Sequence, residues 1–196
     1  MSRPREFDFD KVLHQLMLTF WTKGYKGTSL EDLIAASKLK KQSLYGAYGD
    51  KHTLFLKTLQ LYRIQTLEQM RELLNREDSA AKALELWKSS LLTPSDCYPK
   101  GCFIVNVALE FGTDDLEVKT EIEAMFKESE NLLEEVIVRG QIQNEISKNF
   151  PASIIAKSLA NTQHGLRILV KAGEENQKIK DLLDYAINSI LIVSPN

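Results

Sequence analysis

Cysteine and histidine are scarce in this chain of 196 residues, which contains two cysteines and three histidines. The two cysteines, Cys97 and Cys102, are too few for the disulfide framework of a small secreted domain, and the histidines complete no zinc-site spacing. Glycine-rich phosphate loops, nucleophile elbows and His-Glu-x-x-His motifs are also missing. We therefore expect reduced thiols, no bound metal, no other cofactor and no enzymatic activity.

Long apolar runs are missing as well. The longest are segments such as Cys102 to Leu109 and Ile190 to Val193, whereas a helix needs roughly 18 apolar residues to span a bilayer. The charged start of the chain, Met1 to Lys11, lacks the apolar core of a signal peptide. The sequence therefore predicts a cytoplasmic protein with no membrane partner.

The charge is unevenly distributed along the chain. The net charge is -2, but residues 1–60 carry ten basic and six acidic side chains, and the remainder carries fifteen basic and twenty-one acidic ones. A basic N-terminal part on an acidic body suits a protein that presents one end to a polyanion, although a solvated basic face accounts for the same count.

Apolar residues recur at helical spacing through most of the chain, and no stretch alternates with period two for long enough to predict a sheet. The predicted fold class is therefore all-α, with about nine helices. The residues that carry the helical pattern are 12–21, 30–37, 41–47, 54–74, 80–91, 101–111, 116–137, 154–173 and 179–191.

The second and third predicted helices are short and separated by a tight turn at Lys38-Leu39, behind a longer first helix. This order is typical of a helix-turn-helix, whose second helix enters the major groove of DNA. That helix would be Lys41 to Ala47, with polar residues in its first turn and Leu44 as its apolar anchor. We accordingly expect a DNA-binding domain over residues 1–50, followed by a second, helical domain over residues 51–196.

A string of residues at fixed offsets in this region resembles the TetR family of bacterial repressors. The matching positions, which span about 45 residues, are Phe20, Gly24-Tyr25, Thr28-Ser29, Leu33-Ile34, Ala35-Ala36, Ser43-Leu44-Tyr45, Tyr48, Lys51 and Leu54. The resemblance implies a homodimer that binds a near-palindromic double-stranded DNA operator, represses transcription and is released by a small-molecule effector.

The resemblance also implies roles for individual residues. Thr28 matches a hydroxyl placed against a DNA phosphate at a helix N-terminus, and Lys51 matches a phosphate-contacting lysine. Lys41, Gln42 and Ser43 occupy the first turn of the recognition helix, where side chains meet base edges. The remaining DNA-binding candidates are Lys40, Tyr45 and Tyr48, with both tyrosines also expected to pack the module.

The chain departs from the family pattern at four positions. Lys38 stands where the turn usually has glycine, and Lys40 where serine often caps the recognition helix. Gln42 replaces a small residue, and Gly46 replaces a larger residue that reaches the bases. The operator preference of relatives therefore does not transfer to this chain.

Beyond residue 75 the resemblance is one of architecture. It implies dimerisation through the last two long helices, about 151–173 and 175–193, and an effector pocket among the fourth to seventh helices. Ordinary intramolecular core would use the same apolar stripes and aromatic residues. The pocket candidates combine aromatic walls with a few polar groups: Trp87, Tyr98, Cys102, Phe103, Asn106, Glu110, Phe126 and His164.

Two alternatives remain open at this stage, and the sequence argues against a third. A thiol at Cys102, near Lys100 and a helix start at Gly101, could sense oxidants or electrophiles. A helical protein-interaction module could use the basic end on a partner other than DNA. A carboxylate-bridged metal enzyme would need Glu-x-x-His pairs, and none of the histidines has Glu three residues before it.

Overall fold

The computed structural model describes residues 9–93 and 98–192. Within these residues the regular structure is helical, in the order α1 (Phe9–Lys23), α2 (Leu30–Ser37), α3 (Lys41–Tyr48), α4 (Lys51–Leu74), α5 (Ala80–Leu92), α6 (Phe103–Phe111), α7 (Leu116–Ile142), α8 (Ala152–Ala172) and α9 (Asn176–Asn188). This confirms the all-α prediction. Strand-like pairing in the described residues is limited to one isolated antiparallel bridge, between Ile146 and Leu191.

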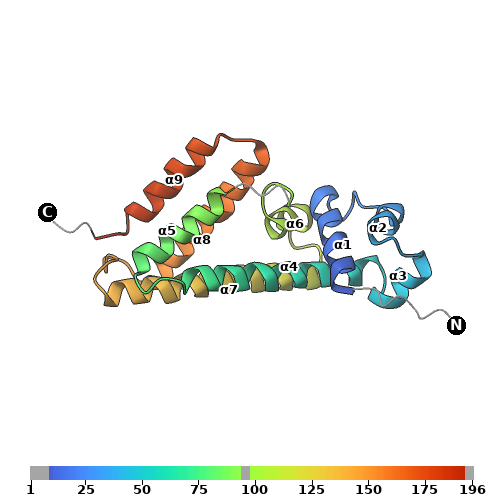
Figure 1. Cartoon of the computed structure of the whole chain (residues 1–196), viewed down its shortest axis with the longest axis horizontal. Coiled ribbons are helices and arrows are strands. Elements are labelled where there is room, and N and C mark those ends of the chain that lie inside the picture. The colour runs from blue at the N-terminus through green and yellow to red at the C-terminus, as the bar shows by residue number, and fades with distance from the viewer. Residues whose placement is uncertain (1–8, 94–97, 193–196) are drawn as a thin grey trace.

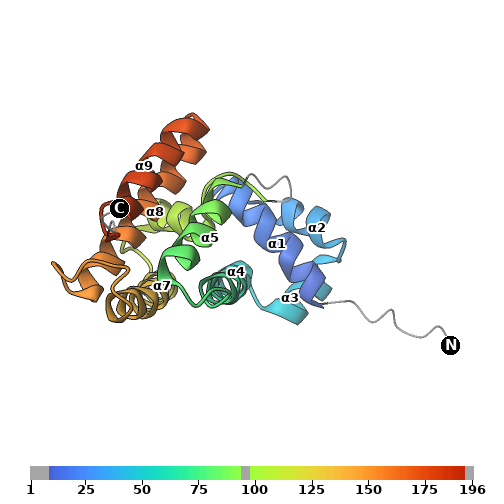
Figure 2. The same ribbon diagram turned by 60° about the vertical axis from the view of Figure 1, so that its left-hand side comes forward.

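The helices form an elongated molecule (Figure 1). Helices α1–α3 gather at one end, α8 and α9 reach toward the other, and the long helices α4 and α7 run along the molecule between them. Turning the view shows α1 crossing above α4 and α3 beside the start of α4 (Figure 2). The arrangement packs α4 against α1 and α3 at the N-terminal end and against α5, α6 and α7 of the body.

One hydrophobic core connects the N-terminal helices with the body. It extends from Leu16 and Phe20 of α1 through Phe55 and Leu59 of α4 to Ile187 of α9. Phe55 packs edge-on against Phe20 at a centroid distance of 5.1 Å and stacks on Phe111 of α6 at 5.5 Å. Rigid packing of this kind ties the position of the N-terminal helices to that of α4 and α6.

Helix α9 ends earlier than the apolar periodicity predicts. The pattern extends through Ile190 and Leu191, but the helix stops at Asn188. The following residues turn back along the segment after α7, where Ser147 N–H donates to Ile190 O and Ile192 N–H donates to Glu145 O. Tertiary pairing therefore replaces the helical hydrogen bonds, and the predicted range of 175–193 is too long at its C-terminal end.

None of the described helices is both long enough and apolar enough to cross a membrane.

Candidate functional site

Helix α3 presents a polar side outward. Lys41, Gln42 and Ser43 in its first turn are exposed, whereas Leu44 is completely buried and holds the helix against the N-terminal core. Tyr45 is half-buried, and nothing within 4 Å would meet a Cβ atom added at Gly46. The exposed face of α3 therefore combines hydrogen-bonding side chains with open space at its centre, which is what insertion into a groove requires.

The turn before α3 contains two of the departures from the family pattern. Lys38 adopts a left-handed conformation with φ 57°, the region in which a residue with a Cβ atom is strained and glycine is not. Lys40 is the N-cap of α3, but its side chain makes no capping hydrogen bond. The chain thus has two exposed lysines where glycine and serine would give a more stable turn.

Helix α2 is well fixed at its N-terminus. The Ser29 hydroxyl accepts from Asp32 N–H, and the Asp32 carboxylate accepts from Ser29 N–H, which completes a capping box. Lys23 donates to the same carboxylate at 2.5 Å. The Lys23 ammonium, together with the Ser29 N–H, lowers the pKa of Asp32 to about 2.

Two predicted DNA-contacting side chains are turned inward. Thr28 is 1% exposed, and its hydroxyl donates to Gly24 O at 2.5 Å. Tyr48 is 4% exposed, and its hydroxyl donates to Phe9 O at 2.8 Å. Both hydroxyls therefore stabilise the N-terminal helices in this conformation and do not face the outer surface beside α3. The side chain that caps α2 is that of Ser29 and not that of Thr28.

Lys51 lies at the first position of α4, next to the cap formed by Asp50. The Asp50 carboxylate accepts from Thr53 N–H at 2.8 Å. The Lys51 ammonium lies 4.4 Å from the centre of the Tyr25 ring, an arrangement that a cation–π attraction stabilises. This contact places the ammonium at the N-terminal end of α4, where helix geometry favours an anion.

Polar contacts link the α1–α2 loop to α6 and the start of α4 to α7. Glu110, near the end of α6, accepts backbone N–H groups from Tyr25 and Lys26. The His52 Nε2 atom lies 2.7 Å from Asp115 Oδ2 at the N-cap of α7. Backbone hydrogen bonding from Val118 and the His52 contact lower the pKa of Asp115 against the opposing effect of burial.

A cavity of about 490 Å³ lies where α1, α4, α5 and the C-terminal part of α8 meet. Met17 and Trp21 of α1 form part of its wall, opposite Arg167 of α8. Its volume falls within the range of small-molecule sites, roughly 300–1,000 Å³. Further lining residues come from α4 and from the segment before α6, among them Tyr62, Gln65, Thr66, Tyr98 and Lys100.

Of the eight pocket candidates, Tyr98 alone lines this cavity. Trp87 and Phe103 are buried core residues, and Cys102 lies behind the wall, where its sulfur accepts the Tyr62 hydroxyl at 3.2 Å. The other four lie elsewhere. Glu110 contacts the α1–α2 loop, the tilted rings of Phe126 and His164 lie 4.3 Å apart between α7 and α8, and Asn106 is on α6.

Sequence analysis missed the rest of the cavity wall, including Trp21 and Arg167. Trp21 belongs to the apolar pattern of residues 12–21, which predicts a core position, and no role was predicted for Arg167. Arg167 does carry a signal, because it interrupts the apolar pattern of α8 between Leu166 and Leu169. Periodicity marks the buried face of each helix, but it does not show which stretch of that face borders an empty space.

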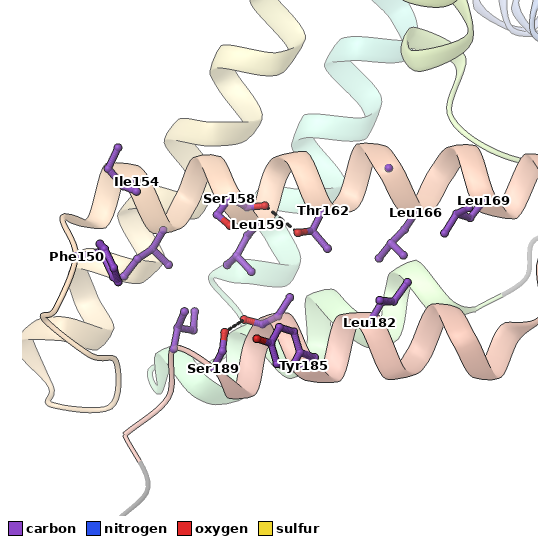
Figure 3. Close-up of a pocket in the computed structure, with 14 residues that line it drawn as sticks. Phe150, Ile154, Ser158, Leu159, Thr162, Leu166, Leu169, Leu182, Tyr185 and Ser189 are labelled. Atoms are coloured by element: carbon purple, nitrogen blue, oxygen red, sulfur yellow. Dashed lines mark hydrogen bonds between the residues drawn. The ribbon is translucent and has the colours of Figure 1, made fainter.

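A second hollow lies on the outer side of α8 and α9 (Figure 3). It has a volume of about 820 Å³ and is mainly apolar, with Ile154, Leu182 and Tyr185 among its lining residues. These three side chains are 51%, 41% and 76% exposed. Ala156 and Ala160, by contrast, are buried, and Gly165 is the small residue of α8 that lines the hollow. We refer to this surface as the α8–α9 face.

An outward polar helix after a tight turn, anchored to a helical body that encloses a cavity, defines the class of helix-turn-helix regulators. Comparison with known proteins identifies the family. Residues 81–186 match the family described as Tetracyclin repressor-like, C-terminal domain. The chain is 28% identical over 191 residues to the HTH-type transcriptional regulator YezE of Bacillus subtilis (strain 168), covering 96% of this chain and 98% of that protein.

The HTH-type transcriptional repressor ComR of Escherichia coli (strain K12) is 26% identical over 187 residues, which cover 92% of this chain and 88% of that protein. A cysteine mutant of the TetR family transcriptional regulator CifR, complexed with 26bp double-strand operator DNA, is 30% identical with a TM-score of 0.84. This match covers 95% of this chain and 99% of that one. The chain belongs to the TetR family of transcriptional regulators.

Proposed function

We propose that this protein represses transcription as a homodimer that binds a near-palindromic operator in the cytoplasm and dissociates when a small molecule fills its body. The observation that carries the proposal is α3, in which buried Leu44 holds Lys41, Gln42 and Ser43 outward. Residues 1–50 would bind DNA, and residues 51–196 would dimerise and bind the effector.

The exposed side chains around α3 suit two kinds of DNA contact. Lys41, Gln42 and Ser43 can donate to base edges in the major groove, and lysine and glutamine favour guanine and adenine acceptors respectively. Lys40 and Lys51 flank α3 and suit phosphate contacts, which position a protein on the duplex without selecting a sequence. Tyr45, half-buried beside them, can reach the DNA backbone.

Relatives support the repressor role. ComR is named a transcriptional repressor, and CifR is complexed with operator DNA of 26 bp. A duplex of that length accommodates two half-sites separated by one helical turn, about 10–10.5 bp. The same geometry in this protein would require two copies of α3 on one side of the duplex.

The α8–α9 face supports dimerisation. Its exposed apolar side chains, among them Ile154, Leu182 and Tyr185, belong to α8 and α9, which reach toward the end of the molecule opposite α3 (Figure 1). A second copy packed there would bury them in a two-fold interface and leave both copies of α3 free.

Selection of bound fragments from random duplex DNA tests the proposal. We expect a recovered palindrome whose half-sites are about 10 bp, or a multiple of that spacing, apart. Recovery of DNA without a shared sequence, or of no DNA, would contradict the proposal and favour a protein-interaction module. Binding is also measured at increasing salt concentration and in competition with a duplex of unrelated sequence. These measurements separate sequence-specific binding from general electrostatic binding to DNA.

A thiol-based response is a second candidate, favoured by the contact between Tyr62 and Cys102. Burial and the neighbouring Cys102 raise the pKa of Tyr62 well above its ordinary value, so its hydroxyl stays protonated and donates to the sulfur. The Tyr62 hydroxyl therefore lies against the sulfur that an oxidant or alkylating agent would modify. A Cys102→Ser variant that keeps its full response to an alkylating agent in an operator-release assay would eliminate this candidate. The other cysteine, Cys97, lies outside the described residues.

A further inference from the structure

The cavity is bordered by both the N-terminal helices and the body of the protein. Met17 and Trp21 of α1 form one side, and Arg167 and Val170 of α8 lie among the residues that complete the wall. A molecule bound there would therefore touch the same helix, α1, that supports α2 and α3. The chemistry of this wall limits what the molecule can be.

Arg167 is a half-buried cation that has no acidic partner in the part of the chain that the structure describes. No carboxylate of residues 9–93 or 98–192 forms an ion pair with it, whereas half-buried Arg63 pairs with Glu121 and Glu128. The positive charge of Arg167 acts on the Tyr62 hydroxyl beside it, whose pKa it lowers against the larger effect of burial. Partly buried cations usually have an anionic partner, and a planar guanidinium suits a carboxylate.

Glu174 is the one acidic side chain among the described residues of the cavity wall, and it is already engaged. Its carboxylate accepts from Lys178 at 2.7 Å, and that contact lowers its pKa. Lys100 adds a second positive charge to the wall. The described lining therefore carries two positive side chains and one acid that is already neutralised by Lys178. This excess of positive charge favours an anionic ligand.

The rest of the wall is aromatic. The Trp21 ring lies 5.6 Å from Tyr98 and 5.1 Å from Tyr62, measured between centroids. Trp21 is 8% exposed, and its indole N–H has no hydrogen-bond partner among the described residues. These rings form a flat apolar surface that a ring-bearing ligand can pack against.

We propose that this cavity binds a small aromatic carboxylate, with its anionic group on Arg167 and its ring against Trp21 and Tyr98. The inference rests on the proposed function, because it assigns a chemical class to the effector. A ring inserted beside Trp21 would displace α1 relative to α8, and the displacement would reach α3 through the N-terminal core. His14 of α1, which lies 5.9 Å from the Tyr98 ring, would move with it.

Titration calorimetry of the full-length protein with three acids tests the inference. The probes are phenylacetate, 3-phenylpropionate and 4-phenylbutyrate, each compared with its neutral primary amide. We expect saturable one-site binding of at least one acid, about 10–100-fold tighter than its amide, as for loss of a charge-assisted hydrogen bond. Arg167→Gln should weaken the binding of the acid by a similar factor and leave the binding of the amide unchanged.

Arg71→Gln is the matched control, because Arg71 is exposed on α4 outside the cavity. Intrinsic fluorescence locates the binding: the acid should quench Trp21 in a Trp87→Phe background, since Trp87 is a buried core residue. Absence of saturable binding by all three acids up to their solubility limit would overturn the inference. Equal binding of acid and amide, or full binding by Arg167→Gln, would do the same.

Operator binding is measured in the same preparation. If the ligand-free protein binds the selected operator and the acids do not bind in the cavity, the inference fails and the proposed function stands. If the ligand-free protein binds no operator, the proposed function itself fails, whatever the acids do.

Discussion

Glu110 accepts a hydrogen bond from the backbone N–H of Tyr25 at 2.9 Å, although 85 positions separate the two residues in the sequence. The same carboxylate accepts from Lys26 N–H at 2.7 Å. Gly24 is essential to this approach, because it has φ +74° and a Cβ atom there would lie 2.8 Å from Glu110 Oε2. The loop between α1 and α2 is therefore fixed directly to α6 of the body.

Glu110→Ala should destabilise this junction. Two backbone N–H groups would lose a charged acceptor, at a cost of about 1.5–3 kcal/mol in the free energy of unfolding. Denaturant unfolding measures the cost, and amide exchange should accelerate at Tyr25 and Lys26 more than in α7. The control is Glu123→Ala, an exposed acid of α7, for which we expect a change within about 0.5 kcal/mol. Equal effects of the two variants would show that the junction contributes nothing specific.

The turn before α3 should gain stability from the residues that the family usually has there. Lys38→Gly removes a left-handed lysine and should stabilise by roughly 1 kcal/mol, and Lys40→Ser adds an N-cap worth about 0.5–2 kcal/mol. Both variants should also bind DNA more weakly, because each removes a positive charge beside α3. Thermal unfolding and salt-dependent operator titration measure the two effects. A variant that is less stable than the wild type would contradict the strain argument.

Sequence patterns predicted the helices of this protein better than its cavity. Helix existence and the outward face of α3 follow from local signals, such as the Ser29 cap and the burial of Leu44. The contact of Glu110 with the α1–α2 loop was not predicted. Its partners are backbone N–H groups far away in the sequence, and a pattern of side chains carries no information about such partners. Likewise, the early end of α9 depends on pairing between Ile146 and Leu191, a contact that only the folded chain creates.

Acid should remove the contribution of Asp32 to stability. Hydrogen bonds from Lys23 and Ser29 lower its pKa to about 2, so the folded state binds the proton less tightly than the unfolded chain does. The contribution is therefore complete above the ordinary aspartate pKa of about 4 and is lost as the pH falls toward 2. We expect the melting temperatures of wild type and Asp32→Asn to differ at pH 6 and to converge near pH 2. Glu31→Gln, an exposed neighbour on α2, should show no such convergence from this cause.

Substitutions at α3 and at Lys51 should have different effects on DNA binding. Lys41→Ala and Gln42→Ala remove base-edge donors and should each cost about 1–3 kcal/mol at the preferred operator while relaxing the preference. Lys51→Ala should weaken binding to all sequences alike and reduce the salt slope by about one. Gel-shift titration against the selected operator and an unrelated duplex measures both. Unchanged affinity and preference in the two α3 variants would place sequence recognition elsewhere.

Charge on the α8–α9 face should separate the proposed dimer. Leu182→Glu combined with Tyr185→Glu would introduce like charges across a two-fold axis, and light scattering should report a monomer where the wild type is a dimer. Operator affinity should then fall about 10²–10⁴-fold, because the two copies of α3 no longer bind as one linked pair. The control is Leu116→Glu, which charges a residue that is 75% exposed at the start of α7. If the double variant remained a dimer with full operator affinity, the dimer would have to form through another surface of the molecule.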